Sequence, residues 1–242
     1  MIEAMRGDVR GRLIDATMEL AALRPWHEIE IRDIARRAEA SLAEFRDHFP
    51  SKGAVLGAFA KRIDREVLEG AATVNAEDES PRDRLFDVLM RRVDALAPHK
   101  QALRNIFDAV RSEPLTLAAL NGVAINSHRF MLQAAGIDVD GPLGAVKVQG
   151  TAIAFSRVLR VWLEEDDPDL ARTMAVLDRE LDKGARTLAR VAEVRRFIAP
   201  FGELAAGLLG RRRPRRPVRT PRDWDGEDRR RARPIDDDPI AV

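Results

Sequence analysis

The chain has 242 residues, no cysteine, and nearly equal numbers of basic and acidic residues, 41 against 40, for a net charge of +1. The lack of cysteine excludes disulfides, thiolate metal sites and a cysteine nucleophile, and the four histidines have no close ligand partners, so we expect no metal and no cofactor. No apolar run approaches the roughly 18 residues of a membrane-spanning helix, and the N-terminus lacks a signal-peptide core, so a cytoplasmic protein is expected.

Apolar residues recur at spacings of three and four between residues 10 and 210, where proline and glycine are sparse, and this pattern predicts an all-α fold. After a first helix containing RLIDATMELAAL, residues 31–52 read as two short helices joined by a tight turn. Small residues keep that turn slim, and Ser41 is a good N-cap for a second helix that runs from Leu42 to Phe49. This arrangement is typical of a helix-turn-helix.

The second of these short helices has one buried and one exposed face. Phe45 and Phe49 lie four residues apart and would share the buried face. The exposed positions are those with which such a motif reads a DNA groove, and basic residues nearby would contact phosphate groups. The predicted DNA-binding residues are Arg32, Ser41, Leu42, Glu44, Arg46, His48 and Lys52. Residues 1–56 carry a net charge of −1, so the placement of individual cations matters more than their sum.

The segment from about Arg10 to Phe59 resembles the N-terminal DNA-binding domain of TetR-type transcriptional regulators. The resemblance rests on RLIDATMELAAL, the connector PWHEIEI, the DIA of the helix-turn-helix, and HFPSKGAVLGAF at the start of the next helix. It implies an all-α, TetR-like homodimer in which a three-helix helix-turn-helix head is joined to a helical ligand-binding and dimerisation body. The implied function is that of a ligand-responsive repressor, whose operator affinity falls when a ligand in the body shifts the spacing of the two heads.

Two positions of the motif depart from the pattern of that family. Its members commonly place a small residue in the turn and a tyrosine shortly before the His-Phe pair, where the hydroxyl meets a phosphate. This chain has Glu39 in the turn and Arg46 at the matching aromatic position, and it contains no tyrosine. Arg46 would replace the hydroxyl contact with a stronger electrostatic one, or read a guanine edge.

The expected domains are a DNA-binding head at 1–60, a ligand-binding and dimerisation body at 61–210, and a disordered Arg-rich tail at 211–242. The resemblance implies a ligand cavity among the helices between residues 82 and 160. Few polar groups accompany the apolar side chains of that region, so we expect a small apolar or amphipathic effector. The residues predicted to line the cavity, or simply to fill the core, are Phe86, Met90, Phe107, Phe130, Met131 and Phe155.

The helices at about 143–163 and 168–190 resemble the dimer-forming pair of the family. Each carries one apolar stripe, which is the pattern of any helix that faces its own core. The same stripes would also suit a four-helix bundle with a second copy, and the sequence leaves both interpretations open. A homodimer is expected because two recognition helices must meet DNA half-sites about one helical turn apart.

A second class of function is a lipid-binding protein that acts at a membrane without specific DNA binding. The TetR fold is also used by the lipid-binding accessory protein of ubiquinone biosynthesis, which VDALAPHKQALRNIF resembles. Residues 193–216 form an amphipathic segment that ends in an arginine cluster, and such a segment would contact an anionic membrane. The alternative interpretation is a last helix packed on the body and a basic tail.

Enzymatic activity has the least support in the sequence. The acidic run from Glu164 to Asp167 lies at a helix end, where solvated charges are expected. No nucleophile with a neighbouring base, no glycine-rich phosphate loop and no metal-ligand spacing accompanies this run. We therefore predict no catalytic residues.

Overall fold

The regular secondary structure is helical throughout the part of the chain that the computed structural model describes, which agrees with the predicted all-α class. Within these residues, no helix is both long and apolar enough to cross a lipid bilayer. The structure describes residues 8–71, 79–110, 114–141 and 143–209.

The chain divides into two compact units, residues 1–194 and 195–242. The head, the core and the candidate sites described below all belong to the first unit. The predicted membrane segment at 193–216 and the Arg-rich tail at 211–242 lie outside the residues whose side chains the structure describes.

The N-terminal head is built around a small apolar core. Asp8 begins the first helix by accepting a hydrogen bond from the Gly11 amide at 2.7 Å, as an N-cap residue does. The core of the head includes Leu13, Ile34 and Phe45, each at most 2% exposed. The helices of the head are α2 (Val9–Leu23), the 3-10 helix η1 (Trp26–Glu28), α3 (Ile31–Arg37) and α4 (Leu42–His48).

The turn between α3 and α4 closes on a residue in the left-handed backbone region. Glu39 has φ of 52°, a conformation that normally favours glycine. The Glu39 amide donates to the Arg36 carbonyl at 3.2 Å, and the Ala40 amide donates to the Ala35 carbonyl at 2.9 Å. This pair of bonds is the Schellman motif, which satisfies the last carbonyl groups of a helix and redirects the chain. The predicted tight turn is confirmed, with glutamate in the position that glycine usually takes.

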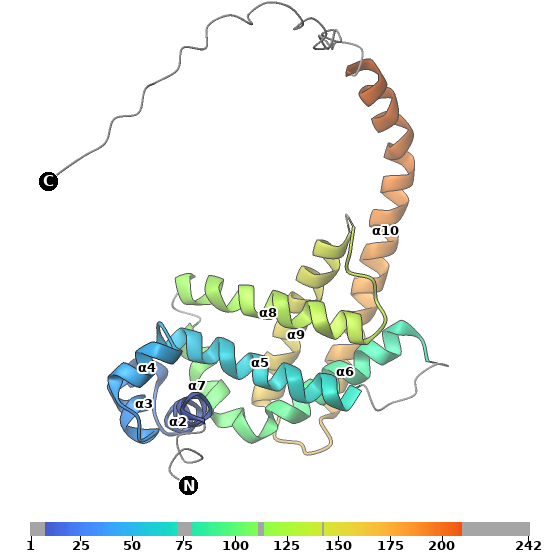
Figure 1. Ribbon diagram of the computed structural model, residues 1–242. Coiled ribbons are helices and arrows are strands. Elements are labelled where there is room, and N and C mark those ends of the chain that lie inside the picture. The colour runs from blue at the N-terminus through green and yellow to red at the C-terminus, as the bar shows by residue number, and fades with distance from the viewer. Residues whose placement is uncertain (1–7, 72–78, 111–113, 142, 210–242) are drawn as a thin grey trace, which may run out of the picture. The chain divides into compact units, whose positions relative to one another are not determined.

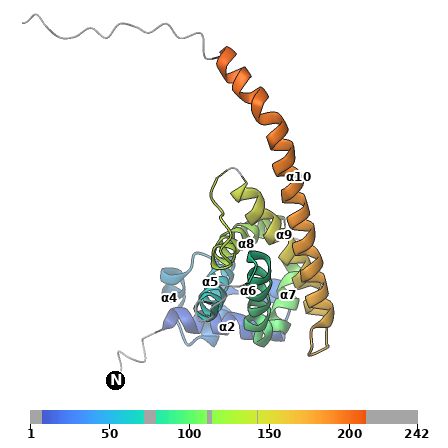
Figure 2. The ribbon, with the colours of Figure 1, turned by 90° about the vertical axis from the view of Figure 1, so that its right-hand side faces the viewer.

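The remaining helices form the body (Figure 1). In Figures 1 and 2, α5 leads away from α3 and α4 and runs beside α8, against which it packs. The long apolar face of α5 buries Val55, Phe59 and Ile63. The helices of the body are α5 (Lys52–Ala71), α6 (Pro81–Leu96), η2 (Ala97–His99), α7 (Lys100–Val110), α8 (Pro114–Ala134), α9 (Gly144–Glu164) and α10 (Ala171–Leu209).

Several helix boundaries follow the sequence signals. Pro81 begins α6, a position that suits proline because the first helical amide has no partner within the helix, and the Ser80 hydroxyl accepts the Asp83 amide at 3.2 Å. Gly136, with φ of 72°, follows the end of α8, and a second Schellman motif joins the Ile137 amide to the Leu132 carbonyl at 2.9 Å.

The junction between α9 and α10 corrects one expectation from the sequence. Glu165 is 2% exposed, so the interpretation of the whole acidic run as solvated charges is wrong for this residue. Its carboxylate accepts the amides of Arg172 and Thr173, both at 2.8 Å, and the Thr173 hydroxyl. Glu165 therefore caps α10 from outside the helix. Burial alone would raise the pKa of this carboxyl, but the hydrogen bonds from Thr173 and Arg172 outweigh burial and lower it.

Candidate functional site

The exposed face of α4 is the first candidate site. Phe45 and Phe49 are buried as predicted, with ring centroids 6.0 Å apart, and they hold α4 against the head. Leu42 is 57% exposed, which leaves it available to a partner. Arg46 and His48 are also exposed. The buried phenylalanine pair therefore orients the other face of α4 toward solvent.

Ser41 and Glu44 have a structural role at the start of α4. The Ser41 hydroxyl accepts the Glu44 amide at 3.1 Å, while the Glu44 carboxylate accepts from the Ser41 amide at 2.8 Å and from its hydroxyl at 2.9 Å. This reciprocal arrangement is a capping box. It satisfies the first amides of α4. It also directs the Glu44 carboxylate back onto the start of the helix, and so holds this negative charge away from an extended conformation that would approach a DNA backbone.

Lys52 at the start of α5 is turned toward the connector of the head. Its ammonium donates to the carbonyl oxygens of Trp26 at 2.8 Å and Ile29 at 3.0 Å, and it lies 4.6 Å from the centroid of the Trp26 ring. These contacts use the charge of the lysine to join α5 to the segment that precedes α3. The primary role that the geometry gives Lys52 is to hold the head together.

The other basic residues of the helix-turn-helix differ in their partners. Arg32 forms an exposed ion pair with Glu30 at 2.6 Å, and Arg37 forms one with Glu19 at 2.7 Å. Arg46 forms no ion pair within the described part of the chain. Since exposed ion pairs are weak, Arg32 and Arg37 could exchange their carboxylate partners for a DNA phosphate. Arg46 has no such carboxylate partner to give up.

A large cavity in the body is the second candidate site. It has a volume of about 630 Å³, within the range of sites for small organic molecules. Its wall is mostly apolar and is formed by α5, α6, α7, α8 and α9, with Phe59, Phe107 and Trp162 among the lining side chains. Leu56 and Phe59 belong to α5, the helix that begins at the head, so one wall of the cavity is continuous with the helix that supports the DNA-binding motif.

A cluster of polar side chains interrupts the apolar wall of this cavity. Arg92 of α6 forms an ion pair with Asp64 of α5, and Ser127 of α8 donates its hydroxyl to Asp64 at 2.6 Å. His128, the next residue, is 2% exposed, and its ring lies 5.1 Å from the Phe155 ring. Burial, together with the positive charge of Arg92, lowers the pKa of His128 to about 4. The imidazole is therefore neutral at pH 7.

The structure distributes the predicted cavity residues between different environments. Phe107 and Phe155 line the large cavity. Phe86 and Met90 pack at the edge of the core, and Met131 is completely buried within it. Phe130 is 52% exposed, and none of these last four residues is part of the cavity wall.

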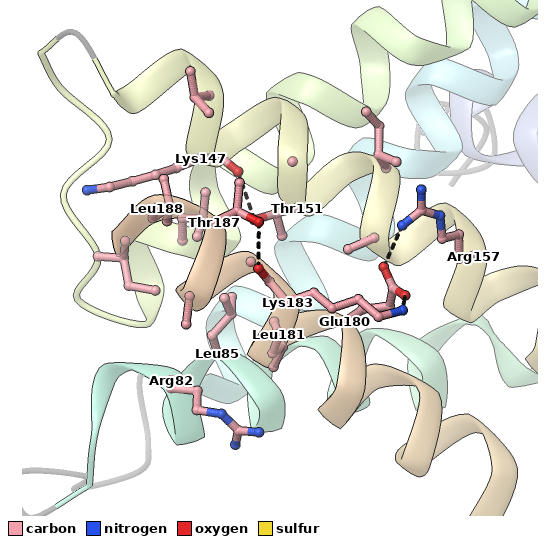
Figure 3. Close-up of a pocket in the computed structure, with 18 residues that line it drawn as sticks. Arg82, Leu85, Lys147, Thr151, Arg157, Glu180, Leu181, Lys183, Thr187 and Leu188 are labelled. Carbon is pink, nitrogen blue, oxygen red and sulfur yellow. Dashed lines mark hydrogen bonds and ion pairs between the residues drawn. The ribbon is translucent and has the colours of Figure 1, made fainter. Parts of the chain in front are cut away.

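A smaller cavity of about 340 Å³ lies between α9 and α10 (Figure 3). Its wall includes Val146 and Ile153 of α9, which are 47% and 44% exposed. At one side the Arg157 guanidinium pairs with Glu180 of α10 at 2.7 Å, and Lys183 pairs with the same carboxylate at 2.6 Å. Val146 and Ile153 are thus left partly uncovered within the described part of the molecule. Among the described residues, no group of His, Cys, Asp and Glu has an arrangement that would hold a metal ion.

A capped helix-turn-helix with an exposed second helix is the architecture of a DNA-binding head. Residues 13–59 match the family model of the bacterial regulatory proteins of the tetR family. The matched segment extends from α2 into α5 and contains the whole helix-turn-helix. The match covers 47 of the 242 residues, and it supports a DNA-binding transcriptional regulator whose head is of the tetR type.

Solved structures support this assignment at the level of the fold. A TetR transcriptional regulator from Nitrosomonas europaea superposes with a TM-score of 0.58 at 22% identity, over 73% of this chain and 97% of that one. A TetR regulator from a Rhodococcus species gives 0.55 at 22% identity, over 74% and 96%. One from Streptomyces coelicolor gives 0.51 at 21% identity, over 84% and 97%. A comparison with curated proteins found no match.

The sequence reasoning missed the polar cluster of the large cavity. His128 is a single histidine within the apolar helix α8, and Arg92 follows another arginine in α6, so neither stands out by its neighbours. Arg92 lies four residues after Val88 and three after Leu89, on the otherwise apolar face of α6, and this position is the signal of its burial in the sequence.

Proposed function

We propose that this regulator is a repressor that binds operator DNA as a homodimer, with α4 as the recognition helix and Arg46 as its principal contact. The observation that carries this proposal is the exposed face of α4, on which Arg46 is the one lysine or arginine of the helix and has no ion pair within the described residues. The family match favours this function over the lipid-binding alternative. Since operator DNA lies in the cytoplasm, we propose a cytoplasmic protein that binds ligands and has no catalytic activity.

The other residues predicted to contact DNA have different roles in this proposal. Leu42 and His48 are exposed at the two ends of α4, so they would meet base edges or sugars beside Arg46. Arg32 would exchange its exposed pair with Glu30 for a phosphate. Ser41 and Glu44 act by fixing the start of α4, and Lys52 acts by fixing α5 to the head.

The experiment that tests DNA recognition measures binding to fragments from the upstream region of the regulator's own gene over a series of salt concentrations. Arg46→Ala should weaken selective binding by about 10- to 100-fold, because a bidentate contact to a base contributes about 1–3 kcal/mol. Arg65, an exposed arginine of α5 outside the motif, provides the matched control as Arg65→Ala. Equal binding by the two variants would remove Arg46 from the interface.

We further propose that a second copy of the chain covers the surface of α9 and α10 around the smaller cavity. Support comes from Val146 and Ile153, which are nearly half exposed although both are large and apolar. Residues of the predicted apolar stripes, such as Val148 and Leu177, are buried within the same chain, so they belong to its own core. The proposed dimer surface is therefore the exposed face of the two helices at 143–163 and 168–190, beside the buried stripes.

The dimer is tested by placing a charge at the centre of this surface. Ile153→Asp should shift the sedimentation of the protein toward the monomer and weaken operator binding in parallel, because one head alone meets only one half-site. Leu23, which is 79% exposed on α2, provides the matched control as Leu23→Asp. A dimer of unchanged stability in Ile153→Asp would place the interface elsewhere.

The proposed effector site is the large cavity of about 630 Å³. Its walls support a small, largely apolar molecule as the ligand. Its position against Leu56 and Phe59 supports a direct effect on α5, the helix that connects to the head. Phe107 and Phe155 keep their predicted role in ligand contact, while the positions of Phe86, Met90, Phe130 and Met131 support a role in the fold.

A further inference from the structure

The first turn of α4 offers mainly apolar groups to a partner. The Ser41 hydroxyl and the Glu44 carboxylate bond to each other and to the amides of these two residues, at 2.8 to 3.1 Å, so the capping box occupies the polar side chains of this turn. The two residues between them, Leu42 and Ala43, are both exposed. Leu42 is the larger of the two and is 57% exposed, so its carbon atoms are accessible before any partner binds.

The place of Leu42 in the helix-turn-helix determines what it would meet on DNA. In such a motif the N-terminal residues of the second helix contact base edges in the major groove. Leu42 is the first residue of α4, and Arg46 is the residue one turn later. Residues four apart are neighbours on a helix surface, about 6 Å apart along its axis. A helix that brings Arg46 to a base therefore brings Leu42 to a base edge nearby in the same groove.

A leucine side chain can recognise one feature of that groove. It has no hydrogen-bond donor or acceptor, so it cannot read the polar edges of guanine, cytosine or adenine. The C5 methyl of thymine is the apolar group that bases present in the major groove. We propose that Leu42 selects a thymine in each operator half-site through contact with its methyl group. This inference rests on the proposed function, because it takes α4 as the recognition helix.

A contact with the DNA backbone is the alternative use of this side chain. A single exposed leucine is ordinary on a protein surface and indicates no partner by itself. Leu42 could also pack on a deoxyribose, but every nucleotide carries that sugar, so such a contact would strengthen binding to all sequences and select none. The two contacts differ in whether the gain in affinity depends on the thymine methyl group.

The test removes the methyl group and nothing else. Duplexes that the full chain binds are selected from a random pool, and each thymine of the selected half-site is replaced in turn by uracil, which lacks only the C5 methyl. A methyl group that leaves water for an apolar contact contributes about fourfold in affinity, so uracil at the contacted position of both half-sites should weaken binding about 10- to 20-fold. At the same position, 5-methylcytosine paired with guanine should bind more tightly than cytosine.

Variants assign the effect to Leu42. Leu42→Ala should weaken binding to the thymine duplex and abolish the difference between thymine and uracil, whereas Leu42→Met keeps an apolar side chain of similar size and should retain the difference. Leu23→Ala is the matched control. Leu23 is 79% exposed but lies two residues from Ala21, whose carbonyl accepts a bond from Asn105 of α7, so it belongs to the end of α2 beside the body.

Two results would overturn the inference and leave the proposed function intact. One is equal binding of the thymine and uracil duplexes at every position of the half-site. The other is a Leu42→Ala variant that loses the same affinity for both duplexes, or none, since either behaviour would separate the leucine from the methyl group. A pool from which the chain enriches no sequence would instead contradict operator binding itself, and this inference with it.

Discussion

Replacing Lys52 with methionine keeps an unbranched side chain that is one atom shorter and removes the charge. The ammonium bonds to two backbone carbonyls of the connector, those of Trp26 and Ile29, at 2.8 and 3.0 Å. A hydrogen bond to a charged group contributes about 1.5–3 kcal/mol, and the partial exposure of Lys52 reduces that value. We therefore expect Lys52→Met to lower the free energy of unfolding by about 2–4 kcal/mol, most of it through loosening of the connector between α2 and α3.

The measurement is urea denaturation of the full chain followed by circular dichroism. Lys61 lies exposed on the same helix, so Lys61→Met is the matched control and should change stability by no more than about 0.5 kcal/mol. Equal stability of the two variants would refute the structural role of Lys52. If Lys52→Met in addition kept the fold and lost operator affinity, the lysine would have to be assigned to a DNA phosphate.

Three further predictions concern the ends of helices. Glu39→Gly should raise the unfolding free energy by about 0.5–1 kcal/mol in a thermal melt, because glycine adopts the positive φ of the turn without steric cost, and a loss of stability would contradict the Schellman geometry. Ser41→Ala should lower it by about 0.5–2 kcal/mol through loss of the α4 cap, with Ser51→Ala as a comparison at the next helix. Glu165→Gln should lower it by about 2 kcal/mol at pH 7. Because the pKa of Glu165 is lowered by folding, its stabilising effect is present above the ordinary carboxyl pKa and lost as the pH falls through the folded-state value, so the difference between wild type and variant should vanish in acid.

The helix-turn-helix could be predicted from the sequence because its signals are local. Ser41 caps the helix whose third residue is Glu44, and Phe45 and Phe49 are one helical turn apart, so a window of ten residues contains the whole argument. Pro81 and Gly136 likewise mark helix ends through their own backbone preferences.

The roles of charged residues could not be predicted in the same way, because their partners lie far along the chain. Lys52 bonds to a carbonyl 26 residues earlier, and Arg92 pairs with a carboxylate 28 residues earlier. Which backbone carbonyl or carboxylate lies nearby depends on how the helices pack, and the helical periodicity of the sequence does not indicate that packing. The partner of Glu165 could not be predicted either, although it is only eight residues away, because the bend between α9 and α10 is what brings the carboxylate to the Thr173 amide.

The effector site and the DNA-binding head share α5, and this determines what a ligand must do to act. Lys52 and Asp64 are twelve residues apart on this helix, a distance of roughly 18 Å along its axis. At one end Lys52 holds the connector of the head, and at the other Asp64 pairs with Arg92 beside the cavity. A ligand that only fills the cavity, with equal affinity for every position of α5, would not change operator binding. A ligand whose contacts with Leu56 and Phe59 change as α5 moves would instead favour one position of this helix. Because α5 itself forms part of the cavity wall, a ligand of the right shape can prefer one position of this helix over another and so change operator binding.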